Sequence, residues 1–291
     1  MKGLRIVLAL GVAALACGAG STAPATEQVL RNDQIDIAYV EPRNPDFERF
    51  YKGLQARKVL EELRAFLAPL QLPKKITIKV DQCDEPNRLY QPGQPVVICY
   101  EYIARLQQLA ASIPADGTTS RGVTRDDAVV GAFVQAVLQQ TSSAVFDALD
   151  TPIWGREQDA ADRLAAFLML QFGPKAARKL INGAAFFFEA SDRTWTGVDF
   201  SDVRGTEAQR YYNYLCIAFG ADPKLFADFY RGEANASSYD ATDVLTARRV
   251  GWCPKEYNDA RWAFTVLLLP HVDRNLLRQV LQRDWLAPFV E

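Results

Sequence analysis

The stretch of sequence that determines the fold covers residues 133–165 and reads FVQAVLQQTSSAVFDALDTPIWGREQDAADRLA. Its first part belongs to a long run rich in apolar residues, which predicts a helix over Asp126–Leu149. Its second part predicts a helix over Arg156–Phe172, which the pair Gly173-Pro174 ends. The letters QQTSS, residues 139–143, are on their own a polar patch on the first helix.

On both sides of these two helices, the sequence predicts further elements: a helix and a small sheet before them and more helices after them. Pro45–Leu70 has apolar residues at near-helical spacing and predicts one amphipathic helix. Ile76–Val80 and Val96–Tyr100 predict strands, with a turn at Pro92-Gly93 between them. The later predicted helices are Glu207–Phe219, Pro223–Tyr230, Glu256–Leu269 and Arg274–Leu286.

These elements predict one α+β domain over residues 44–291, mainly helical with a small N-terminal β-sheet. Residues 24–43 are polar and have few periodic apolar positions, so we expect them to form a tether. No internal repeat or low-complexity segment suggests a second domain.

The composition excludes several classes of function. The chain has 291 residues, 49% of them hydrophobic, and a formal net charge of -2. A nucleic-acid-binding protein needs a basic surface to neutralise phosphates, so we expect no nucleic-acid partner. His271 is the only histidine, and no zinc site with two or three histidines can form from this chain alone. Its place after Pro270 predicts a surface or helix-start position.

Residues 1–23 have the features of a secretory signal peptide. Lys2 and Arg5 supply the positive charge, and the apolar run that follows is too short for a stable membrane span. Cleavage before Cys17 would allow lipidation of that cysteine, and cleavage after Ala23 is the alternative. We therefore expect an exported protein, periplasmic or secreted, which is attached to a membrane only if Cys17 is lipidated.

Four cysteines remain after the leader, and an even number in an exported chain favours disulfides. Of the three possible connectivities we prefer Cys83–Cys99 with Cys216–Cys253, because each pair closes a local loop. No Cys-x-x-Cys pair is present, which argues against a zinc-thiolate site.

Several segments, taken in order, resemble one family. They are Cys83 to Glu101 with Asn87 and Tyr90-Gln91-Pro92, Asp147 to Glu157, Asp159–Asp162, Gln209 to Cys216, Gly220–Pro223, and Cys253 with Glu256-Tyr257. Together they resemble a family of secreted bacterial zinc metallopeptidases, often catalogued as a domain of unknown function. In that family His-Glu-x-x-His on one helix is followed by Glu-x-x-Ala-Asp on the next.

The resemblance implies a zincin-like fold and assigns four positions of a zinc site. The ligand histidines correspond to Gln139 and Ser143, the general base to Gln140, and the third ligand to Gln158. Neutral amides and a hydroxyl cannot replace imidazole and carboxylate ligands, so we expect the zinc of the family to be lost here, with no other cofactor.

The resemblance also concerns two residues near these positions. Asp162, which in such families supports a ligand histidine, is retained but is expected to have no partner. A histidine of the family shortly before Glu207 corresponds less directly to Arg204.

Other residues suggest weaker sites. Glu157, Asp159 and Asp162 could form an acidic cluster for Ca2+, but an ion pair of Asp159 with Arg163, four residues later on the helix, is the simpler expectation. Ser142 and Ser143 have no base that the sequence places beside them. No Gly-x-Ser-x-Gly elbow or glycine-rich phosphate loop occurs.

The sequence thus predicts an exported metallopeptidase-like protein without catalytic activity, whose partner is a peptide or an envelope protein. We expect an extended peptide to lie beside the strand Val96–Tyr100. Two alternatives stay open. The chain could be an active hydrolase with a non-standard site, or a structural envelope lipoprotein anchored through Cys17.

Overall fold

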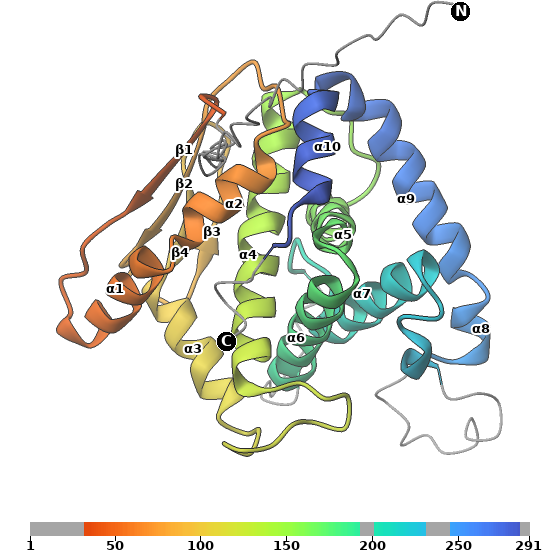
Figure 1. Ribbon diagram of the computed structural model, residues 1–291, viewed down its shortest axis with the longest axis horizontal. Helices are drawn as coiled ribbons and strands as arrows, with labels where there is room; N and C mark the ends of the chain where they lie inside the picture. The colour runs from red at the N-terminus through yellow and green to blue at the C-terminus, as the bar shows by residue number, and fades with distance from the viewer. Residues whose placement is uncertain (1–31, 193–200, 231–244, 286–291) are drawn as a thin grey trace, which may run out of the picture.

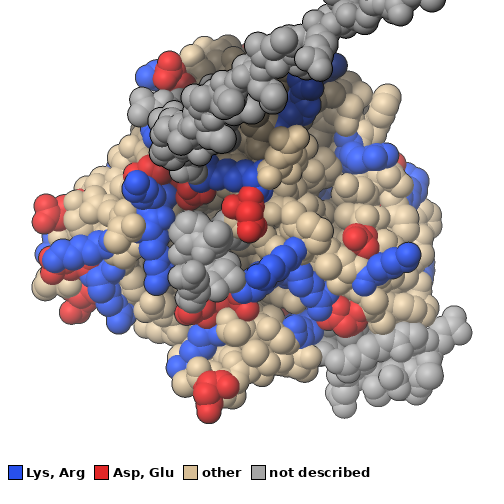
Figure 2. Space-filling model, viewed as in Figure 1, with Lys and Arg blue, Asp and Glu red and all other residues tan. Residues whose placement is uncertain are grey.

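The computed structural model describes residues 32–192, 201–230 and 245–285 (Figure 1). The predicted leader 1–23, with Cys17 and both cleavage sites, lies outside these residues. On the face drawn in Figure 2, acidic and basic side chains are interspersed, which agrees with the near-neutral net charge.

A mixed four-stranded sheet forms one side of the molecule. Its strands are β1 (Ile35–Tyr39), β2 (Ile76–Asp81), β3 (Arg88–Leu89) and β4 (Val96–Cys99), in the spatial order β1-β2-β4-β3. Both β1 and β4 run parallel to β2, whereas β3 runs antiparallel to β4. The two predicted strands are confirmed, except that Tyr100 is already the first residue of a helix.

The strand β1 corrects the expected tether. It lies within residues 24–43, and its residue Ile35 is buried beside Ile76 of β2. Of its five residues Ile35 is buried and Asp36 is exposed, while Ile37–Tyr39 are half-buried. The domain therefore begins before residue 44.

The helix predicted over Pro45–Leu70 is divided in two. A 3-10 turn, Pro45–Phe47, leads into α1 (Glu48–Ala56), and α2 (Val59–Leu67) follows. Lys58 separates them in the left-handed conformation with φ 52°. The apolar spacing continues across this bend because both helices bury the same side of the chain.

Helix α4 passes through the middle of the molecule, with the sheet on one side and α5, α6 and α7 on the other (Figure 1); α3, α5 and α6 pack directly on it, and α7 packs on α5 and α6. The helices that follow the sheet are α3 (Tyr100–Ala110), α4 (Arg125–Ala148), α5 (Glu157–Met169), α6 (Pro174–Asp192), α7 (Glu207–Ala221), α8 (Ala247–Val250), α9 (Cys253–Leu267) and α10 (Arg274–Gln282).

The helix predicted over Pro223–Tyr230 is wrong. Asp222 accepts hydrogen bonds from the backbone N–H groups of Lys224 and Leu225, which forms a turn, and only Ala227–Phe229 make a 3-10 helix.

At Gly173-Pro174 one helical segment ends and α6 begins at once. Gly173 takes φ 89° and Pro174 occupies the first position of α6.

Both preferred disulfides are present. Cys83–Cys99 joins the loop after β2 to the end of β4, and Cys216–Cys253 joins α7 to the start of α9. The fold is therefore the expected α+β domain with two disulfides.

Among the described residues one helix, α4, is long and apolar enough to cross a bilayer. Its most apolar window is 89% buried within the fold, as in the core helix of a globular domain. We therefore describe α4 as a core helix.

Candidate functional site

The candidate site is built on α4, whose residues from Gly131 to Phe146 are all buried. The helix starts at a capping box, in which Thr124 accepts a hydrogen bond from the N–H of Asp127. A helix buried on every side is apolar unless its polar side chains find partners inside the fold. The polar run Gln139–Ser143 must therefore be satisfied internally.

Gln139, Gln140, Ser143 and Gln158 meet where α4 faces the start of α5. Gln139 Nε2 donates to Gln158 Oε1 at 2.6 Å, and Gln140 Nε2 donates to Gln139 Oε1. Gln158 Nε2 lies 3.4 Å from Ser143 Oγ, which it approaches as a donor. The four positions that the resemblance assigns to the zinc ligands and the base are thus joined in one chain of hydrogen bonds.

This group of side chains does not fit a zinc ion. Zinc sites in proteins use imidazole, thiolate or carboxylate ligands, and three amides with one hydroxyl supply none of these. The amide oxygens of Gln139 and Gln158 already accept hydrogen bonds from neighbouring amides. No carboxylate joins the group, so no side chain here can serve as a general base at neutral pH.

Asp162 has partners, contrary to the expectation from sequence. Arg210 of α7 donates to both of its carboxylate oxygens, at 2.7 Å from Nε and 3.0 Å from Nη2. Gln135, one turn before Gln139 on α4, also donates to Asp162 at 3.1 Å. Arg210 further contacts Glu207 and is only 1% exposed. Burial opposes its charge, but the two carboxylates outweigh burial and raise the pKa of Arg210 above its usual value.

A cleft of about 650 Å3 opens beside the amide group, between the chain after β3 and the loop from α4 to α5. Its lining includes Tyr90, Pro92, Asp147, Ile153, Arg156 and Gln158. The Tyr90 hydroxyl donates to Asp147 at 2.8 Å. Burial and this hydrogen bond raise the pKa of Tyr90 to about 12, so its phenol is protonated at neutral pH.

A second hollow, of about 470 Å3, shares Arg156 with this cleft. Its other lining residues, Gln209, Tyr212, Asn213, Thr246 and Arg249, are polar or amphipathic. The two hollows follow one another across the start of α5.

The strand expected to receive a peptide is not at an edge of the sheet. β4 pairs with β2 on one side and with β3 on the other, so its backbone groups are already used. The edge on this side is β3, where Leu89 is 43% exposed. Val96–Tyr100 is therefore not the free edge that we expected for a peptide, and the edge strand β3 leads directly to Tyr90 at the cleft.

The acidic cluster expected from Glu157, Asp159 and Asp162 does not form. Glu157 is exposed at the cleft, whereas Asp162 is buried against Arg210. Asp159 pairs with Arg156, three residues before it, at 2.9 Å, and the expected pair with Arg163 is not formed. The three carboxylates consequently have separate surroundings.

The other residues singled out from the sequence lie apart from the amide group. Arg204 pairs with Asp202 through its side chain, and its carbonyl accepts a hydrogen bond from Arg156. Ser142 donates to the carbonyl of Leu138 in its own helix. His271 is half-buried in a 3-10 turn before α10, in agreement with its predicted helix-start position.

In the part of the chain that the structure describes, one set of metal-ligand atoms comes close together, from Cys83, Cys99 and Glu101. Its cysteines form a disulfide, and Glu101 accepts hydrogen bonds from the N–H groups of Cys83 and Asp84. These contacts are those of a structural loop.

Sequence reasoning missed the roles of Gln135 and Arg210. The signal for Gln135 was its spacing: it lies four residues before Gln139, and residues four apart share one face of a helix. Nothing local connects Arg210 with Asp162, which precedes it by 48 residues. Arg88 on β3, one of the few buried charged residues, carried no signal either.

Comparison with protein families gives one finding. The model of a family described as "Putative metallopeptidase" matches residues 39–268, which is most of the chain. No curated protein and no solved structure matches the sequence.

Proposed function

The chain belongs to the metallopeptidase family whose model covers residues 39–268, and we propose that it is an exported member that has lost catalysis and binds peptides. The observation that carries the loss of catalysis is the hydrogen-bonded group of Gln139, Gln140, Ser143 and Gln158. These neutral side chains form hydrogen bonds with one another. They provide neither ligands for zinc nor a general base that could take a proton from a water molecule.

Peptide binding is supported by the surroundings of the cleft. The edge strand β3 offers a backbone to an extended chain, and adding a strand to a sheet edge is a common mode of peptide recognition. Two apolar side chains at or beside the cleft are largely exposed. Val203 of the lining is 70% exposed, and Trp154, in the loop between the lining residues Ile153 and Arg156, is 99% exposed. Exposed tryptophans are frequent anchors of protein–peptide contacts.

The loss of catalysis is tested with purified protein, by metal analysis and by digestion of casein and a peptide library. We expect no stoichiometric zinc and no cleavage. The matched control is the quadruple variant Gln139→His, Gln140→Glu, Ser143→His and Gln158→Glu, in which zinc binding at one ion per chain is expected because the backbone positions are kept.

One bound zinc per natural chain would overturn the proposed loss of catalysis. Cleavage by the natural protein that disappears in Gln140→Ala would show an active hydrolase with a non-standard site. Cleavage that persists in Gln140→Ala would place the activity elsewhere in the chain.

Peptide binding is tested by measuring the peptides that immobilised protein retains from the same library. We expect Trp154→Ala to weaken retention about tenfold, since a tryptophan that a bound ligand covers commonly contributes this much. Trp154 belongs to the loop that contributes Asp150, Thr151 and Ile153 to the cleft lining, whereas α9, which carries the control Trp262, contributes no residue to it. Trp262→Ala removes a side chain that is 70% exposed and should leave retention unchanged. Equal loss in both variants, or no retention by the natural protein, would contradict peptide binding.

Export is proposed from the leader, and the two disulfides are compatible with an oxidising compartment. N-terminal sequencing of the mature protein tests cleavage before Cys17 or after Ala23. Incorporation of a labelled lipid precursor that is lost in Cys17→Ser would establish a membrane-anchored lipoprotein. A mature protein that retains residues 1–16 would contradict export.

A further inference from the structure

A cavity of about 290 Å3 lies between the first four helices of the domain. Its lining comes from α1, α2, α3 and the first half of α4, with Phe172 of the 3-10 turn after α5 and Trp285 after α10. Figure 1 shows α1, α2 and α3 on the sheet side of α4. The cavity shares no lining residue with the two hollows of the candidate site. It is therefore a separate feature of the fold, which the proposed function does not use.

The walls of this cavity are apolar. They include the side chains of Phe50, Leu54, Leu63, Ile103, Val130 and Phe133. The indole N–H of Trp285 donates to the carbonyl of Val280 at 2.7 Å, so this side chain needs no further hydrogen-bond partner. Among the described residues of the lining, no buried side-chain polar atom lacks a partner. Such a cavity favours an apolar ligand over water.

Two arginines of the lining, Arg49 and Arg57, are exposed and mark the opening of the cavity. Gly53 lies between them at intervals of four residues, so all three positions share one side of α1 and its C-terminal cap. A Cβ atom built at Gly53 would meet no atom within 4 Å. The space between the two arginines is therefore open at the level of Gly53.

The two arginines have no acidic partner within the described part of the chain. Arg49 donates to the neutral amide of Gln107 at 3.1 Å, and its guanidinium lies 4.7 Å from the centre of the Phe50 ring. The acidic residue of the lining, Glu62, is instead bound by Arg283 at 2.7 Å. The opening thus carries positive charge above an apolar interior.

We infer that this cavity binds a fatty acid, with its aliphatic chain among the apolar walls and its carboxylate beside Arg49 and Arg57. The two oxygens of a carboxylate match the fork of N–H donors on a guanidinium. A volume of about 290 Å3 is at the lower end of the range for ligand pockets, roughly 300–1,000 Å3. It suits a single chain of medium length better than the two chains of a phospholipid. This inference does not depend on peptide binding.

Most of the affinity should come from the chain and not from the charge. Burial of one methylene group strengthens binding about fourfold, whereas an exposed ion pair contributes about fivefold at most. The arginines, which are exposed, therefore add a preference for an acid over a neutral head group. Chain length and head group can accordingly be tested separately.

The test is isothermal titration calorimetry of the full-length protein with octanoate, decanoate and dodecanoate, each below its micelle concentration. We expect one molecule to bind per chain. The affinity should rise about fourfold with each added methylene group until the chain fills the cavity. Decanol, which has the same chain length as decanoate and no charge, should bind more weakly than decanoate.

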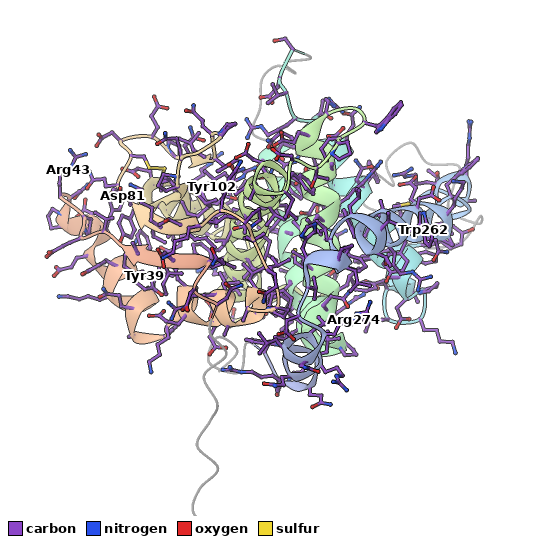
Figure 3. The ribbon with its side chains drawn as sticks, turned by 90° about the horizontal axis from the view of Figure 1, so that it is seen from above. Tyr39, Arg43, Asp81, Tyr102, Trp262 and Arg274 are labelled. Atoms are coloured by element: carbon purple, nitrogen blue, oxygen red, sulfur yellow. A yellow bond between two sulfur atoms is a disulfide. The ribbon has the colours of Figure 1, made fainter. Side chains whose placement is uncertain are left out.

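The head group is tested with the double variant Arg49→Met and Arg57→Met. It should bind decanoate about five- to tenfold more weakly, since two exposed ion pairs are lost, and decanol with unchanged affinity. The matched control is Arg274→Met, which removes an exposed arginine of α10 that does not line the cavity. Figure 3 shows Arg274 toward the helical side of the molecule, away from Tyr39 and Arg43 on the sheet side. This control should keep the preference for the acid.

The location is tested with a variant that fills the cavity. Val130→Phe enlarges a half-buried side chain of the lining, and it should weaken the binding of decanoate and decanol by at least about tenfold, because the room for several methylene groups is lost. Filling a cavity commonly stabilises a fold, so the ligand-free Tm should stay the same or rise. If Val130→Phe does not fold, Gly53→Leu supplies the same test from α1, where the added Cβ meets no atom.

Several results would overturn the inference. These are no binding by the natural protein, an affinity that does not depend on chain length, equal affinity for decanoate and decanol, and binding that neither Val130→Phe nor Gly53→Leu weakens. Residues 286–291 lie outside the described part of the chain and follow Trp285 of the lining. If the natural protein does not bind decanoate and the double variant Leu286→Asp and Phe289→Asp does, the cavity belongs to this segment and not to a fatty acid.

Discussion

Glutamine suits the buried positions 139 and 140 and the half-buried position 158 because its amide both donates and accepts hydrogen bonds. A histidine or carboxylate at these depths would require a metal ion or an opposite charge. The amides instead satisfy one another and bring no charge into the core. One turn away, Asp162 does carry a charge, and there the fold supplies Arg210. The buried side chains at and beside the positions that the resemblance assigns to the zinc site are thus neutral or paired.

The Asp162–Arg210 pair gives a prediction about stability. Arg210→Met should lower the free energy of unfolding by about 3–5 kcal/mol, because it leaves the Asp162 carboxylate buried with only Gln135 as a donor. Asp162→Leu should be similarly harmful. The double variant should lose much less than the sum of the two, since neither charge is then left alone. Urea unfolding measures all three, and additive losses would contradict a coupled pair.

At the scale of elements, local patterns predicted the two central strands and most helices, whereas the missed elements depend on distant partners. β3 has only two residues, Arg88 and Leu89, and is defined by its pairing with β4. β1 needs β2, which lies about 40 residues later in the chain. The bend at Lys58 leaves the apolar spacing intact, so periodicity could not reveal it.

The candidate site divides in the same way. Gln139, Gln140 and Ser143 lie within one helical turn, so their closeness could be predicted from α4 alone, and the resemblance added Gln158. The partner of Asp162, Arg210, approaches from α7, and no local pattern predicts such a contact. The edge of the sheet was misplaced because β3 was missed, and without β3 the last strand would be β4.

The contact between α4 and α6 depends on two glycines and gives a second prediction. A Cβ atom at Gly183 would lie 2.0 Å from the carbonyl oxygen of Asp127, and one at Gly131 would lie 2.6 Å from that of Leu180. Both obstacles are backbone atoms, so the helices would have to separate. Gly183→Ala should lower the free energy of unfolding by at least about 1–3 kcal/mol.

The matched control for this prediction is Gly53→Ala on α1. No atom lies within 4 Å of a Cβ built there, so the change should stabilise the protein by about 0.5–1 kcal/mol through helix propensity. Thermal and urea unfolding compare the two variants. An unchanged stability in Gly183→Ala would mean that α4 and α6 do not approach this closely.

Across the whole molecule, tyrosine hydroxyls join the sheet side to the helices. Tyr39 of β1 donates to Glu61 of α2 at 2.7 Å, and Tyr100 of α3 donates to the carbonyl of Val40 after β1 at 2.7 Å. Tyr90 after β3 donates to Asp147 of α4. Burial is the largest cause that raises the pKa of each of these phenols, followed in Tyr39 and Tyr90 by the hydrogen bond to a carboxylate. The arrangement of sheet against helices therefore depends on protonated phenols.

This dependence predicts the response of the fold to alkaline pH. An unfolded tyrosine has a pKa near 10, in order of magnitude, and that of Tyr90 in the fold is about 12. The folded state therefore holds the proton more tightly, so the stabilisation is complete below about pH 10 and is lost as the pH rises toward the folded pKa. Urea unfolding should show a falling free energy of unfolding between about pH 10 and 12. Tyr90→Phe removes one of the contributing groups, and its curve should fall less steeply over this window. If the two curves are parallel, the Tyr90 phenol has the same pKa in both states and its link to Asp147 contributes nothing to the pH dependence.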